Sequence, residues 1–161
     1  MNRKTLLLGF FLIFISQTIF SQSDFKFPYR EGYVNDFEGV FSSEQILELN
    51  SIVGQQEKET TNEIVIVSIK SFEPFETLFD YSLKLANNWG VGQKDKNNGI
   101  TIVFGKQIRQ IRIQVGYGLE KKLKDEEAKK IIDNVIIPEF KKGDYFVGIK
   151  NGLTEIIKEI D

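Results

Sequence analysis

Two runs of mostly apolar, β-branched residues place the strongest limit on how this chain can fold. They occupy residues 64–69 and 100–104, and neither alternates apolar with polar side chains. Such runs are typical of strands that are covered on both faces of a sheet. Helices must therefore lie on both sides, and we predict an α/β fold: a three-layer α/β/α sandwich around a small mixed sheet.

The surrounding segments supply the helices and a third strand. Apolar residues at helical spacing predict helices over residues 42–59, 75–89, 125–137 and 144–160. Ser42 and Gln45 match a capping box, Gly90 is suited to end the second helix, and Pro138 with Gly143 is expected to separate the last two. Residues 111–115 alternate in polarity, which predicts a strand with one wetter face that pairs as a hairpin.

The first 21 residues have the features of a secretory signal peptide. A basic start at residues 2–4 precedes an apolar run at residues 6–15 and then a polar stretch. We expect cleavage after Ser21 and export to the periplasm or medium, with no membrane anchor left. The alternative is a retained N-terminal anchor, but residues 6–20 fall short of the roughly 20 that a spanning helix needs. Residues 22–32 are expected to form an extended arm, and residues 33–161 a single domain.

The composition excludes several classes of chemistry. The chain has no His and no Cys, which rules out a Ser-His-Asp triad, a Cys nucleophile and a dithiol redox centre. Zinc, haem and iron–sulfur sites lose their usual ligands as well. Loss of the signal peptide removes two basic residues and no acidic one, so the net charge of -2 becomes -4. An acidic chain without a basic patch does not suit nucleic acid, and we expect a monomer that binds cations or partner proteins.

Three polar loops contain the candidate binding residues. They span residues 34–39, 94–99 and 116–120, the last continuing to Asp125. Each combines carboxylate or amide oxygens with glycine, and if the three converge they form a cage suited to Ca²⁺ or Mg²⁺. A purely structural interpretation stays open: residues 97–99 make a good turn, Asp36 can cap one, and Asp125 can stabilise a helix start.

Several short motifs in a fixed order resemble the TPM domain family. The resemblance covers about residues 33–160, and its segments are Val34-Asn35-Asp36, Glu63-Ile64-Val65-Ile66-Val67, Asn88-Trp89-Gly90-Val91-Gly92, Asn98-Gly99-Ile100, Gly116-Tyr117-Gly118-Leu119-Glu120, Ile137-Pro138-Glu139-Phe140 and Gly143-Asp144-Tyr145. The resemblance implies an exported α/β/α domain. It also implies divalent-cation binding and, from a plant relative in the thylakoid lumen, acid phosphatase activity.

The resemblance also implies which residues would hold the ion. The ligand set carried over to this chain is Asp36, Asn98, Glu120 and Asp125, with Asp95 and Asn97 as neighbours. Two departures weaken the transfer: Asn97 replaces a frequent Asp, and the C-terminal membrane helix and glycine-rich tail of many bacterial relatives are missing.

Three functions follow as hypotheses. The first is a Ca²⁺- or Mg²⁺-binding module that acts through a partner in the cell envelope. The second is a metal-assisted acid phosphatase of low activity, against which stands the lack of a nucleophile motif, of His, and of Arg in the three loops. The third is a structural adaptor without an ion. The first two require that the three loops meet at one rim of the sheet.

Overall fold

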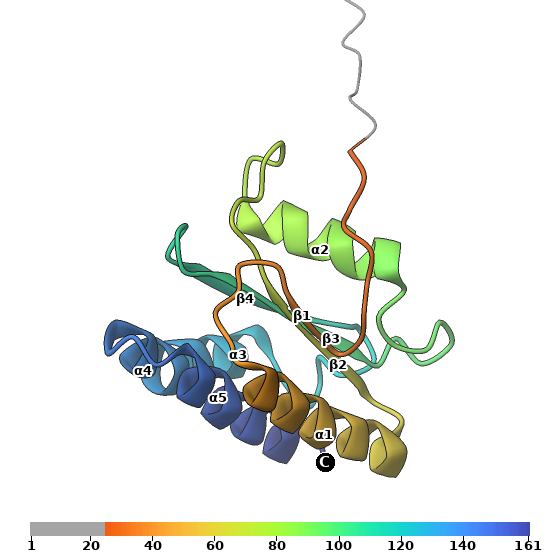
Figure 1. Cartoon of the computed structure of the whole chain (residues 1–161). Coiled ribbons are helices and arrows are strands. Elements are labelled where there is room, and N and C mark those ends of the chain that lie inside the picture. The colour runs from red at the N-terminus through yellow and green to blue at the C-terminus, as the bar shows by residue number, and fades with distance from the viewer. Residues whose placement is uncertain (1–24) are drawn as a thin grey trace, which may run out of the picture.

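The structure, a computed structural model, describes residues 25–161 (Figure 1). The expected signal peptide therefore lies outside the described residues. Four strands form one sheet in the order β1-β2-β3-β4: β1 (Val34–Asp36), β2 (Glu63–Ser68), β3 (Gly99–Gly105) and β4 (Gln110–Val115). β1, β2 and β3 run parallel and β4 is antiparallel to β3, so the sheet is mixed as predicted.

Helices cover both faces of this sheet. One face carries α2 (Leu78–Trp89) alone. The other carries α1 (Ser43–Thr60), α5 (Tyr145–Ile160) and a continuous helical segment made of α3 (Asp125–Ile131), the π-helix η1 (Ile132–Ile136) and α4 (Ile137–Lys141). Figure 1 shows the three layers edge-on, and the predicted α/β/α sandwich is confirmed. No helix among residues 25–161 is both long and apolar enough to span a bilayer.

The central strands divide their side chains between two cores. Ile64 and Ile66 of β2 pack into the core under α1 and α5, whereas Val65 and Val67 pack into the core under α2. All four side chains are fully buried. The lack of alternation in β2 thus has the predicted cause, because both faces of the strand are covered and excluded from solvent.

Local signals place the helix ends. The Ser42 hydroxyl accepts from the Gln45 amide at 3.3 Å and the Gln45 side chain accepts from the Ser42 amide at 2.9 Å, which confirms the capping box. Gly90 ends α2 in the left-handed conformation at φ 63°. α2 begins three residues later than predicted because the Thr77 side chain caps it.

Two boundary predictions are wrong. Residues 34–36 were expected to be loop but form β1, a strand too short to show any periodicity. Pro138 does not end the third helix, which passes through η1 and α4 and stops before Gly143. Pro138 lies in the first turn of α4, where its missing N–H costs little, and the wider π-helical turn before it helps to accommodate the ring.

The N-terminal arm lies against α2. Residues 25–31 form no helix or strand, and the rings of Phe25 and Phe27 pack edge-on or stacked against Phe75 and Tyr81. The Trp89 indole donates to the Pro28 carbonyl at 3.0 Å.

Candidate functional site

Asp36 ends β1 at the carboxyl edge of the parallel strands, and its carboxylate holds the following loop. Oδ1 accepts from the amides of Gly39 and Val40, each at 3.1 Å, and from the hydroxyl of Ser68. Oδ2 accepts from the Phe41 amide at 2.8 Å. The four bonds account for most of the acceptor capacity of the group. Asp36 therefore caps the β1–α1 loop, as the structural interpretation allows.

The second and third loops, residues 94–99 and 116–120, meet at the opposite end of the strands from Asp36. The Gly118 amide donates to the Asn97 carbonyl at 3.0 Å and the Gly116 amide to the Gly99 carbonyl at 2.8 Å. A Cβ at position 118 would lie 2.0 Å from the carbonyl oxygen of Lys96. The Gly-Tyr-Gly motif is thus explained by close approach of two backbones.

Strand register separates these loops from Asp36. Asp36 pairs with Ser68 and Ser68 with Phe104, whereas Glu63 pairs with Gly99 at the opposite end of the same strands. The separation is five residues of β2, about 17 Å at the usual rise per residue. The expectation that all three loops share one rim is therefore wrong. In a parallel sheet, a loop that precedes a strand lies at the opposite end of the strands from a loop that follows one.

The remaining predicted ligands differ in whether their side chains are already hydrogen-bonded within the chain. Asn98 is only 4% exposed, and its amide accepts from Gln93 at 2.8 Å and donates to the Thr61 carbonyl at 2.6 Å. Its side chain is thereby committed to its own turn and to Thr61 at the end of α1. Asp95, Asn97 and Glu120 are exposed on the two joined loops. Within residues 25–161 no group of three acidic side chains is placed to hold a metal ion.

Asp125 lies elsewhere, at a groove along β4 that sequence reasoning missed. The groove has a volume of about 1050 Å³ and lies between the first turn of α2, the strand β4 and the α3–η1–α4 segment. Its lining includes Phe79, Arg112, Ile132, Phe140 and Asp125. The residues of this surface come from segments that are distant in sequence, so no local sequence motif indicates the groove.

The outer edge of β4 runs along this groove without a neighbouring strand among the described residues. The Gly116 amide bonds to Gly99, its antiparallel partner by extension of the β3–β4 register. Because backbone groups alternate in direction along an antiparallel strand, Gln110, Arg112 and Gln114 also face β3. The N–H and C=O groups of Ile111, Ile113 and Val115 consequently face outward.

The groove carries a positive excess in an acidic chain. Four basic residues line it against two acidic ones, while the chain has a net charge of -2. Lys129 pairs with Asp133 at 2.6 Å, but Arg109, Arg112 and Lys141 have no ion pair among residues 25–161. The Arg112 guanidinium lies 4.9 Å from the ring centre of Phe79, and its buried Nε has no hydrogen-bond partner in the described part of the chain.

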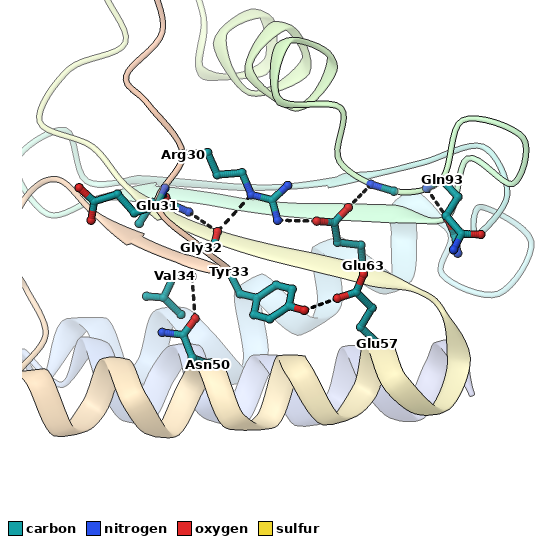
Figure 2. Close-up of polar contacts among 12 residues, drawn as sticks. Arg30, Glu31, Gly32, Tyr33, Val34, Asn50, Glu57, Glu63 and Gln93 are labelled. Carbon is teal, nitrogen blue, oxygen red and sulfur yellow. Dashed lines mark hydrogen bonds and ion pairs between the residues drawn. The ribbon is translucent and has the colours of Figure 1, made fainter.

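A second polar cluster fastens the arm to the domain (Figure 2). Arg30 forms an ion pair with Glu63, whose other oxygen accepts from the Gly92 amide at 2.5 Å. The Tyr33 hydroxyl donates to Glu57, and this hydrogen bond, together with burial, raises the pKa of Tyr33. Each of these groups has a partner within the chain, so the cluster is structural.

Comparison with known proteins places the fold. A family model described as the TPM domain matches residues 34–159. The N-terminal domain of a protein from P. gingivalis, solved by NMR, is 32% identical with a TM-score of 0.73 and covers 80% of this chain and 82% of its own.

Two further NMR structures share the fold at lower identity. The N-terminal domain of a protein from Corynebacterium glutamicum is 15% identical with a TM-score of 0.63, over 84% of each chain. A protein from the psychrophilic bacterium Bizionia argentinensis is 19% identical with a TM-score of 0.66, over 77% of this chain and 83% of its own. No match is found among curated proteins.

Proposed function

Because the chain belongs to the TPM domain family, we propose that it is an exported binding module that recognises a partner protein through the groove beside β4. The observation that carries this proposal is the open edge of β4 at the groove. Unpaired edge strands tend to pair with strands of other chains, and folded proteins usually keep them short, place charges on them or cover them. This edge is six residues long, whereas β1 at the other side of the sheet has three.

The proposal is tested by selecting peptides from a random displayed library against the purified chain. We expect selected peptides to shift the backbone amide resonances of β4 and of the α3–η1 segment. Ile132→Lys, which places a charge in the groove, should abolish binding. Leu47→Lys is the matched control, because Leu47 is 69% exposed on α1. Selection of no peptide, or of peptides that bind Ile132→Lys unchanged, would refute the proposal.

A divalent cation held by the two joined loops alone, without Asp36, is a second proposed function. It is supported by the hydrogen bonds that tie residues 94–99 to residues 116–120, because they hold Asp95, Asn97 and Glu120 on neighbouring, exposed loops. Two carboxylates and one amide leave the other positions to water, which suits Mg²⁺ or a weakly held Ca²⁺. Ion binding would raise the melting temperature by mass action.

Titration with each metal separates this proposal from the first. We expect millimolar Ca²⁺ or Mg²⁺ to shift the amides of both loops and to leave those of β4 unmoved. The variant Asp95→Asn with Glu120→Gln should abolish the shifts, and Asp133→Asn on η1 is the control. A melting temperature that neither metal nor chelator changes would refute the cation site.

The acid phosphatase remains the competing proposal. It requires an acid free to hold a metal or to take part in catalysis, and Asp36 is engaged in four hydrogen bonds far from the other predicted ligands. We expect no turnover of p-nitrophenyl phosphate with Mg²⁺ or Ca²⁺. Turnover that disappears in Asp36→Asn while the variant stays folded would favour the enzyme over the binding module.

Export is proposed from residues 1–21, which match a signal peptide. Mass spectrometry of the protein recovered from the periplasm or medium of an expressing bacterium should show a chain that begins at Gln22. A chain retained in the membrane fraction with Met1 intact would favour the anchored alternative.

A further inference from the structure

The geometry points to a specific way in which the groove takes its partner, and this step rests on the proposed function of the groove. We propose that an extended segment of the partner pairs with β4 as a fifth strand. Its side chains alternate between acidic residues on the α2 side and apolar residues on the α3–α4 side.

The backbone of β4 supplies the docking groups. Ile111, Ile113 and Val115 direct three N–H and three C=O groups away from β3. No described residue bonds to these groups. They recur every second residue, about 7 Å apart, which is the spacing at which an extended chain presents its own backbone groups. Ile111 and Val115 are partly exposed, whereas Ile113 is 2% exposed. Strand addition therefore requires the side chains that cover the middle of this edge to move aside before it satisfies these groups.

The two walls of the groove differ in chemistry. On the α2 side lie the alternate side chains of β4, including Arg112 over the ring of Phe79. On the other side lie Ile111 and Ile113, which pack into the larger core beside Ile132 and Phe140. A paired strand projects successive side chains to opposite faces of the sheet. Consecutive residues of the partner thus meet a cationic wall and an apolar wall in turn.

Arg112 selects an acidic residue on its side. Its Nε is buried without a partner, and Arg109 at the hairpin turn adds a second unpaired cation within the described chain. The guanidinium of Arg112 forms no ion pair within residues 25–161. A carboxylate opposite Arg112 would pair with the outer nitrogens of this group with the added strength of a charged hydrogen bond. An acidic segment is also attracted by the positive excess of the groove.

The same charges disfavour a second copy of the chain as the occupant. Pairing of β4 with β4 from another molecule would bring the two Arg112 side chains into cross-strand range. Like charges at that range are destabilising. The occupant is therefore a different protein with acidic residues in a strand-forming segment.

The test uses synthetic peptides of matched composition. The first has the sequence Ser-Ile-Glu-Val-Glu-Ile-Thr with blocked ends, the second replaces Glu by Lys, and the third scrambles the order so that the alternation is lost. We expect only the first to bind, and to slow hydrogen exchange at the amides of Ile111, Ile113 and Val115. N-methylation at the peptide residues that face β4 should abolish binding, and N-methylation at the alternate residues should preserve it.

Two variants test the cationic wall. Arg112→Gln should weaken binding of the acidic peptide about tenfold, in line with the loss of a charged hydrogen bond. Arg109→Asn should weaken it less, and Asn tolerates the positive φ of 51° at that turn position. Lys94→Gln, on the loop at the other edge of the sheet, is the control and should bind as the wild type does.

The outcomes separate the two proposals. Equal binding of the Lys or scrambled peptide, or binding with no protection of the β4 amides, would overturn strand addition while resonance shifts at Ile132 would still support a binding groove. No shift in the groove with any of these peptides or with library-selected ones would overturn both. Concentration-dependent dimers with protected β4 amides would overturn the choice of a different protein.

Discussion

Removal of the Asp36 carboxylate should destabilise the fold strongly although the side chain is partly exposed. Asp36→Ala leaves four donors without their acceptor: three loop amides and the hydroxyl of Ser68. Water can replace the carboxylate at the exposed Gly39 amide, whereas the bonds from the Val40 amide, the Phe41 amide and the Ser68 hydroxyl are partly buried. Three poorly replaceable bonds at about 1 kcal/mol each give an expected loss of about 3 kcal/mol.

Urea unfolding followed by far-ultraviolet circular dichroism and by Trp89 fluorescence measures this loss. The slope with urea should stay constant, so the midpoint alone should fall. Asp36→Asn keeps one oxygen and should lose about half as much. Asp95→Ala is the matched control: Asp95 is exposed and makes no side-chain bond within residues 25–161, so the change should stay within about 0.5 kcal/mol. Equal stability of Asp36→Ala and Asp95→Ala would refute the structural role assigned to Asp36.

Two further predictions concern the joined loops and the core under α2. Gly118→Ala should cost about 1–3 kcal/mol, because the added Cβ would lie 2.0 Å from the carbonyl oxygen of Lys96, while Gly32→Ala, whose Cβ would meet its nearest neighbour at 3.8 Å, should be near neutral. Burial raises the pKa of Tyr81 to about 12, so the folded state keeps a proton that the unfolded state loses above about pH 10. Stability should therefore fall as the pH rises from 10 towards 12, by about 1.4 kcal/mol at pH 11, and thermal melts of Tyr81→Phe should lack this component.

The sequence predicts the layers well because their signals are local and strong. The mostly apolar run at residues 64–69 requires cover on two faces, and the capping box at Ser42 marks a helix start within one turn. The alternation at residues 111–115 predicts a hairpin strand, which β4 confirms. These features depend on neighbours in the chain, and tertiary packing did not override them.

The candidate site is predicted poorly because it depends on which loops lie at the same end of the strands. Asp36 follows a parallel strand and Asn98 precedes one, so their loops lie at opposite edges. That assignment needs β1 to be recognised as a strand, and three residues carry no periodicity. A polar loop with a carboxylate and a glycine is also what a capped turn requires, and Asp36 and Asn98 both proved to be bonded within their own turns.

The edge of β4 shows how an alternating strand can carry information that a buried one cannot. The polar positions of residues 110–115 would be expected to face solvent on an ordinary surface strand, yet Arg112 packs over Phe79 and its Nε is buried without a partner in the described chain. In the proposed complex a partner carboxylate would pair with this cation, whereas a second copy of the chain would be repelled by it. The same side chain would then both disfavour pairing of β4 with another β4 and select an acidic strand.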